Sequence, residues 1–167
     1  MNAEAKITLS AEDIDRLKGA MGTFATGVTV VSTHDGEMDH AMTCNSFNTV
    51  SLDPPMVLWS IRQESASRDA FRNGNGYTVS VLGADAEATA MKFAVDPLET
   101  RYDDIAATRL DSGRLVLDDA VAWFDCALDQ VVHAGDHDIL IARVLSFQSN
   151  DAEPMVYLRG KFTRAAD

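Results

Sequence analysis

The chain has 167 residues, of which 46% are hydrophobic and 24% charged, and its formal net charge is -12. This length predicts one domain, residues 1–167, with a core of its own, and the negative charge argues against nucleic acid or an anionic membrane surface as a partner. No apolar run approaches the ~20 residues of a membrane helix, and the N-terminus shows no secretory signal, so we expect a cytoplasmic protein.

The first predicted element is an amphipathic helix over about residues 10–22. Ser10 is a plausible N-cap, and Ile14, Leu17 and Met21 then recur at helical spacing. From residue 27 the pattern changes to alternating β-branched residues, which is typical of strands.

The remaining elements are mostly strands joined by turns. Strands are predicted at 27–34, 40–51, 56–61, 77–82, 120–135, 137–150 and 155–164. Two short helices are predicted at 64–74 and 85–95, and residues 96–117 are predicted to form a long polar loop with at most one helical turn. Hairpins with inserted helices indicate a mainly β protein that forms an antiparallel barrel over about residues 27–163. The pattern alone does not give the order of the strands in this barrel.

The predicted strand at 40–51 has an unusual composition. It carries no charged residue from Ala41 to Leu52, and it is rich in hydroxyl and amide side chains: Thr43, Asn45, Ser46, Asn48, Thr49 and Ser51, with the thiol of Cys44 among them. A solvent-facing strand is one explanation. The absence of charge favours contact with a polar, uncharged ligand edge, such as a heteroaromatic ring bearing carbonyl and imide groups.

A local positive excess follows in "SIRQESASRDAFR", where three arginines face one Glu and one Asp. Ser65 and Ser67 precede Arg68 near the predicted helix start, and hydroxyls, a guanidinium and a helix N-terminus together favour binding of a phosphate group. Helix capping with a Glu64–Arg68 pair is a structural alternative, and the two are compatible.

The cysteines and histidines do not indicate a metal. Cys44 and Cys126 lie far apart and form no CxxC pair, so we expect reduced thiols. His133 and His137 are four residues apart, but the flanking residues predict strands, in which this spacing does not create a ligand pair. At the turn "AGDHD", His137 could be structural, hydrogen-bond a carboxamide or assist a proton transfer. No GxGxxG, phosphate-loop or GxSxG motif occurs.

Five segments in this order, "FATGVTVVST", "MTCNSFNTVSLDPPMVLWSI", "YTVSVL", "AGDHDILIARV" and "PMVYLRGKF", make the chain resemble the flavin reductase-like family with the FMN-binding split barrel. The resemblance runs from about Leu17 to Phe162 and is closest to the short reductase components of two-component flavin-dependent monooxygenases. It implies a homodimer of Greek-key split barrels with flavin in a cleft near the dimer interface. It also implies reduction of FMN or FAD by NADH or NADPH and release of reduced flavin to a separate oxygenase.

The resemblance further implies which residues form the site. The flavin ring and ribityl chain would contact Thr26, Gly27, Val28, Thr29, Thr43, Cys44, Asn45 and Ser46. The flavin phosphate would contact Ser60, Ile61, Arg62, Ser65, Ser67 and Arg68, and Ser80 stands where an Asn is often found. His137 would position the nicotinamide. Cys44 and Asn45 replace an Ala-Ser pair of the family pattern, and Arg68 replaces a Thr, which leaves the choice between FMN and FAD open.

Three other functions stay open at this point. One is a flavoprotein that reduces another acceptor, such as a corrinoid or a ferric complex. A second is a non-catalytic FMN-binding module. Such a module would not need the nicotinamide contact that the resemblance implies for His137. The third is an acidic interaction protein without a ligand, which would leave the uncharged strand unexplained.

Overall fold

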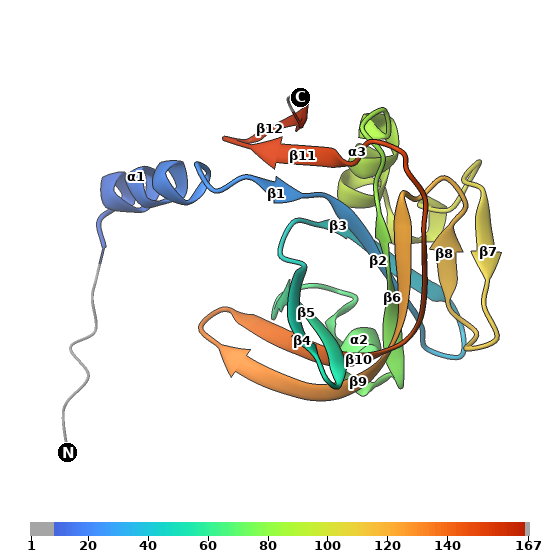
Figure 1. Ribbon diagram of the computed structural model, residues 1–167. Coiled ribbons are helices and arrows are strands. Elements are labelled where there is room, and N and C mark those ends of the chain that lie inside the picture. The colour runs from blue at the N-terminus through green and yellow to red at the C-terminus, as the bar shows by residue number, and fades with distance from the viewer. Residues whose placement is uncertain (1–8, 166–167) are drawn as a thin grey trace, which may run out of the picture.

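The computed structural model describes residues 9–165, so the ends of the predicted domain, 1–8 and 166–167, lie outside the described residues. The predicted first helix is confirmed as α1 (Ala11–Met21), and the Asp13 backbone N–H donates to Ser10 Oγ at 3.1 Å as its N-terminal cap. None of its residues is buried, and it projects from the body of the molecule beyond β1 (Thr26–Gly27) (Figure 1). No helix in residues 9–165 has both the length and the apolar character needed to cross a membrane.

The main sheet has seven antiparallel strands in the order β3-β2-β6-β9-β10-β5-β4, so the predicted mainly β, antiparallel fold is confirmed. The strands are β2 (Thr29–His34), β3 (Asp39–Cys44), β4 (Asn48–Leu52), β5 (Pro55–Arg62), β6 (Gly76–Val81), β9 (Ala122–Ala134) and β10 (His137–Ser149). The two edge strands, β3 and β4, are consecutive in the chain, with only residues 45–47 between them. Such a connection spans at most about 14 Å, so the sheet has to curl until its two edges approach each other at this corner.

This arrangement corrects the prediction of one continuous strand at 40–51. Asp39–Cys44 pairs with β2, whereas Asn48–Leu52 pairs with β5 at the opposite edge of the sheet. The chain therefore breaks between the two segments, and the residues of the break, 45–47, lie where the two edges approach.

Two further predictions are corrected. The segment 155–164 forms a hairpin of β11 (Met155–Leu158) and β12 (Lys161–Arg164), which turns at Arg159 and Gly160 with positive φ values, and β11 pairs with β1. The predicted loop at 96–117 contains a 3-10 turn, η1 (Leu98–Thr100), and a hairpin of β7 (Ala107–Arg109) and β8 (Leu115–Leu117). Strands of three residues are too short to show a recognisable alternation of polar and apolar residues.

The helices close two hydrophobic clusters. α2 (Arg68–Asn73) places Phe71 against Trp59 and Tyr77 inside the curled sheet. α3 (Glu87–Val95) packs Ala90 and Phe93 with Val30, on the opposite face of β2 from Val31 of the first cluster, beside β8 and β11. In Figure 1 α3 accordingly lies near β11 and β12, and α2 lies near the β9–β10 hairpin.

A buried ion pair holds the β7–β8 hairpin against the sheet. Arg114 Nε and its terminal NH2 donate to the same oxygen of Asp125, at 2.9 and 2.7 Å. The two side chains are only 8% and 7% exposed. The charge of each residue is therefore compensated mainly by the other.

Candidate functional site

A cavity of about 330 Å³ lies where β2 begins and β3 ends. It is lined by Val28, Thr43, Cys44, Asn45, Met91, Ala94, Tyr157 and Phe162. None of these side chains is charged. Four residues for which the resemblance implies flavin contact are thus brought together: Val28, just before β2, and Thr43 to Asn45, at the end of β3 and just after it. α3 and the β11–β12 hairpin provide the rest of the wall.

Hydrogen bonds fix the strand residues of this cavity. Thr43 Oγ1 donates to the carbonyl of Ala90 at 2.6 Å, which ties β3 to α3. Thr29 lies opposite Cys44 in the β2–β3 register, and its hydroxyl is 3.2 Å from the Cys44 carbonyl and 3.1 Å from Cys44 Sγ. Burial raises the pKa of the Cys44 thiol, so Cys44 forms a neutral wall and is not a thiolate nucleophile.

Thr26 provides an unused hydroxyl beside the cavity. It pairs with Tyr157 in the β1–β11 register, and Tyr157 lines the cavity. Thr26 Oγ1 is buried and has no hydrogen-bond partner among the described residues. A buried hydroxyl without a partner is costly. Thr26 is not among the residues that line the cavity, so a ligand would reach this hydroxyl only if the β1–β11 edge moved.

A continuous path of contacts leads from the cavity to the β9–β10 turn. Ser46 Oγ accepts from the backbone N–H of Ser60 at 3.0 Å and donates to its carbonyl at 3.2 Å, so the β3–β4 connection is bound to β5. Further along β5, Arg62 lies opposite His137 in the β5–β10 register. These contacts therefore bring three segments that are far apart in sequence next to one another in space: Asn45 and Ser46, Ser60 to Arg62, and His137.

Arg62 and Ser65 form the polar part of this path. Arg62 is exposed and forms no ion pair within residues 9–165, and the Ser65 backbone N–H donates to its carbonyl at 3.1 Å. A guanidinium without an ion-pair partner, on the same turn as a serine hydroxyl that accepts from the Ser67 N–H at 3.3 Å, suits a phosphate group. Ile61, between Ser60 and Arg62, is 1% exposed, so only its backbone can contribute.

Three predicted contact residues are buried or bonded within the protein, two of them, Arg68 and Ser80, through their side chains. α2 begins at Arg68 and has six residues, so it is shorter than the helix predicted at 64–74, and Ser67 is buried without a side-chain capping bond. Arg68 Nε donates to Asp138 at 2.7 Å, and this bond holds the pKa of the Asp138 carboxyl below its usual value. Ser80 Oγ accepts from the Leu117 backbone N–H at 3.1 Å, in the interior. These contacts favour structural roles for Ser67, Arg68 and Ser80.

His137 begins β10, and its side chain is 35% exposed. Its Nδ1 lies 2.7 Å from a carboxylate oxygen of Asp136, and this contact lowers the pKa of Asp136. Nε2 has no partner in the described part of the chain, so it is the ring nitrogen that a ligand can reach.

Several residues at the site were missed by the sequence analysis. Met91 and Ala94 are three positions apart in α3, so they share a face of that helix, but nothing in the sequence shows that this face meets β3. Tyr157 and Phe162 contact each other with ring centroids 5.5 Å apart and ring planes tilted by 54°. They come from a segment predicted as one strand, so a hairpin prediction at Arg159–Gly160 would have been needed to bring them together.

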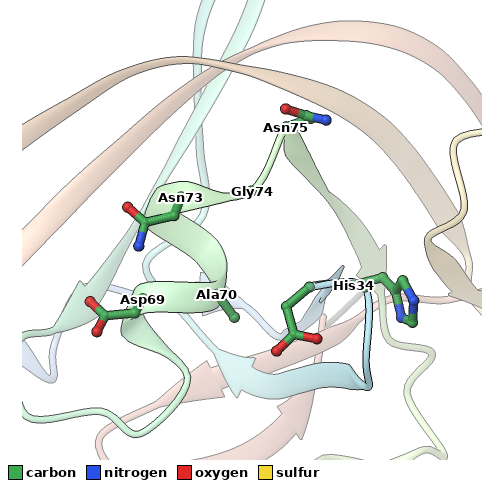
Figure 2. Close-up of a pocket in the computed structure, with 8 residues that line it drawn as sticks. His34, Asp69, Ala70, Asn73, Gly74 and Asn75 are labelled. Atoms are coloured by element: carbon green, nitrogen blue, oxygen red, sulfur yellow. The ribbon is translucent and has the colours of Figure 1, made fainter.

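A larger cleft, of about 590 Å³, lies at the other end of the β2–β3 hairpin. Figure 2 shows Asp69, Ala70 and Asn73 of α2 on one side of it and His34 on the other. None of the predicted site residues lines this cleft. Its carboxylates, Asp35 and Asp69, would repel a phosphate group, so the smaller, uncharged cavity is the better candidate for a nucleotide.

Comparison with known proteins finds relatives that are named flavin reductases. The chain is 35% identical over 153 residues to the FMN reductase (NADH) SmoA of Agrobacterium fabrum, which covers 92% of this chain and 87% of that protein. It is 36% identical over 150 residues, 89% of this chain, to the reductase component of the flavin-dependent trigonelline monooxygenase of Acinetobacter baylyi, but it spans only 48% of that protein's length.

Solved structures show the same fold. The NADH:FAD oxidoreductase SgcE6 of Streptomyces globisporus, in complex with NAD and FAD fragments, superimposes with a TM-score of 0.88 at 31% identity over 96% of this chain and 97% of that one. The family model for the flavin reductase like domain matches residues 21–166. This chain therefore belongs to the family of proteins with a flavin reductase like domain.

Proposed function

We propose that this chain is an NADH- or NADPH-dependent flavin reductase that reduces FMN or FAD and supplies the reduced flavin to a separate monooxygenase. The observation that carries the proposal is the uncharged cavity lined by Thr43, Cys44 and Asn45, which is joined through Ser46 and Ser60 to His137. SmoA is named as an NADH-dependent reductase of FMN, and the Acinetobacter protein as the reductase component of a monooxygenase. These names support the reaction and the oxygenase partner.

The residues divide into three groups in this proposal. Thr43, Cys44 and Asn45 would hold the isoalloxazine ring with neutral groups, which grip a ring without adding a fixed charge to it. Arg62 and Ser65 would hold the flavin phosphate. His137 would bind the carboxamide of the nicotinamide through Nε2.

When bound, the flavin supplies a hydride acceptor for the nicotinamide. The protein's part is to hold two planar rings in contact and to keep water away from them. No side chain is given a proton-transfer role, because the thiol of Cys44 is neutral and Thr43 already donates its hydroxyl proton to Ala90.

The direct test is the oxidation of NADH and NADPH by the purified protein, followed by absorbance, with and without added FMN or FAD. We expect turnover that rises and saturates with free flavin. Turnover without added flavin, by a yellow protein, would mean a prosthetic flavin and another final acceptor. A folded protein that binds FMN but oxidises neither nucleotide would contradict the reductase and leave the non-catalytic binding module.

Replacing His137 with Ala should raise the KM for NADH about tenfold, equivalent to about 1.4 kcal/mol of lost binding. The affinity for flavin should stay unchanged, because the imidazole is assigned to the nicotinamide alone. His34→Ala, at the far end of β2, is the matched control and should change neither constant. Steady-state kinetics at saturating flavin measure the effect, and an unchanged KM in His137→Ala would remove this residue from the site.

We also propose that the curled sheet closes as a Greek-key split barrel and that two chains form a homodimer. The β3–β4 connection and its bonds to Ser60 support closure. Exposed apolar side chains support association: Phe24 is 74% exposed, Leu52 94%, Leu145 61% and Phe147 69%. Assembly would remove such side chains from water. We place the protein in the cytoplasm, where nicotinamide nucleotides and free flavin are both present.

Sedimentation equilibrium tests the dimer. We expect twice the mass of the chain at micromolar concentration and dissociation in Phe147→Asp. The exposed substitution Glu37→Gln, in the turn between β2 and β3, serves as the control. A wild-type protein that sediments as a monomer would contradict the dimer.

A further inference from the structure

Gln63 follows the last residue of β5, and it bonds to four residues at the tip of the β9–β10 hairpin. Its side-chain Nε2 lies 2.7 Å from His133 Nδ1, 3.1 Å from the Gly135 carbonyl and 3.3 Å from the His137 carbonyl. Its backbone N–H donates to the carbonyl of Asp136 at 3.0 Å. The side-chain amide therefore faces acceptors on both strands of the hairpin and in the turn between them.

The tip of this hairpin is largely exposed, and besides Gln63 it is held by the β9–β10 pairing and by a 3.4 Å contact of His133 Nδ1 with Asp138. The side chains of His133 and Asp136 are 70% and 86% exposed, and Gly135 has a φ of +63°. The β5–β10 pairing ends at Arg62 and His137. Hairpin ends with few buried contacts fray readily, so the contacts of Gln63 extend the attachment of β5 to the hairpin just beyond the position where His137 lies.

The other side of His137 is fixed as well. Asp138, the next residue, is 1% exposed and accepts the 2.7 Å bond from Arg68 in α2. His137 thus lies between a buried anchor at Asp138 and the contact of its own carbonyl with Gln63. His137 is also paired with Arg62 of β5 and with Ala134 of β9, so the contact with Gln63 adds to this strand pairing at its last position.

We propose that Gln63 is a positioning residue for His137, and that its amide sets the affinity for the nicotinamide nucleotide without touching the flavin. This inference rests on the proposed function, in which His137 binds the nicotinamide. The amide acts as a donor: its two hydrogens face the carbonyl oxygens of Gly135 and His137, while His133 Nδ1 also lies 3.4 Å from a carboxylate oxygen of Asp138. Gln63→Glu keeps the length of the side chain but replaces the donors with a carboxylate, which the same carbonyl oxygens would repel.

The experiment titrates NAD+ into flavin-loaded protein by calorimetry and measures kcat and KM for NADH in parallel. The chains compared are wild type, Gln63→Glu, His137→Ala and the double variant, with Glu64→Gln as the control. Glu64 is the exposed neighbour of Gln63 and forms no ion pair in residues 9–165. The flavin dissociation constant and the melting temperature are measured for each chain.

We expect Gln63→Glu to weaken NAD+ binding and raise the KM for NADH about five- to tenfold, as the loss of one or two hydrogen bonds allows. The flavin affinity and melting temperature should stay as in wild type. The double variant should bind NAD+ no more weakly than His137→Ala, because Gln63 acts only through that residue.

Each other outcome has a definite meaning. Normal NAD+ binding by Gln63→Glu, with weak binding by His137→Ala, would overturn the inference and leave the proposed function intact. Normal binding by His137→Ala would refute the nicotinamide role of His137 itself. Additive effects in the double variant would show that Gln63 acts independently of His137. A lower melting temperature or weaker flavin binding in Gln63→Glu would show general support of the fold. Additive effects, a lower melting temperature or weaker flavin binding would each overturn the positioning role.

Discussion

Asp125→Ala is expected to lower the free energy of unfolding by about 3–5 kcal/mol, because it leaves the Arg114 guanidinium buried without its counter-ion. Arg114 is 8% exposed and directs two donors at one carboxylate oxygen of Asp125. Domains of this size have a total stability of about 5–15 kcal/mol, so the loss would be a large part of the whole. Urea denaturation followed by tryptophan fluorescence measures it.

The fold explains why this pair matters for the site. It attaches the β7–β8 hairpin, whose Leu117 packs in the same cluster as Ala90 and Phe93 of α3. α3 in turn provides Met91 and Ala94 to the cavity. We therefore expect flavin affinity to fall in Asp125→Ala along with stability.

Two controls separate loss of the pair from loss of charge. The double variant Arg114→Met/Asp125→Leu removes both charges and should be clearly more stable than Asp125→Ala, since no buried charge remains unpaired. Asp15→Ala breaks an ion pair whose side chains are 74% and 81% exposed, and it should change stability by less than about 1 kcal/mol. Equal stability of Asp125→Ala and wild type would contradict a buried, mutually compensated pair.

Gly76→Ala is expected to destabilise the protein by about 3 kcal/mol or more, from backbone strain and steric overlap together. Gly76 begins β6 with a φ of +151°, and a Cβ atom there would lie 1.9 Å from the carbonyl oxygen of Cys126 in β9. Because that neighbour is backbone in the middle of the sheet, it can move only if the β6–β9 pairing changes.

The matched control is Gly19→Ala in α1, where a Cβ meets nothing within 4 Å. Alanine favours a helix over glycine by up to about 1 kcal/mol, so the urea midpoint should stay the same or rise. A Gly76→Ala protein with the wild-type midpoint would show that β6 and β9 do not approach each other this closely.

Some features of the chain depend on residues close together in sequence, and these could be predicted. The first helix follows from the Ser10 cap and the spacing of Ile14 and Leu17, and its limits agree with the structure within one residue. Most of the strands follow from their alternation of side chains. The uncharged segment Thr43–Asn45 was identified by composition alone, and it lines the cavity.

Which side chains are available to a ligand was decided by tertiary structure. Arg68 and Ser80 belong to residue types that bind ligands, but Asp138 and the Leu117 backbone, 70 and 37 residues away, occupy their polar groups. Nothing in the sequence around Gln63 distinguishes it from other polar residues. Its position beside the β9–β10 turn follows from the pairing of β5 with β10. Local sequence determines helices, strands and turns, because their hydrogen bonds and periodicity are local; the partner of a given polar group depends on which distant strands pair, and no local pattern contains that information.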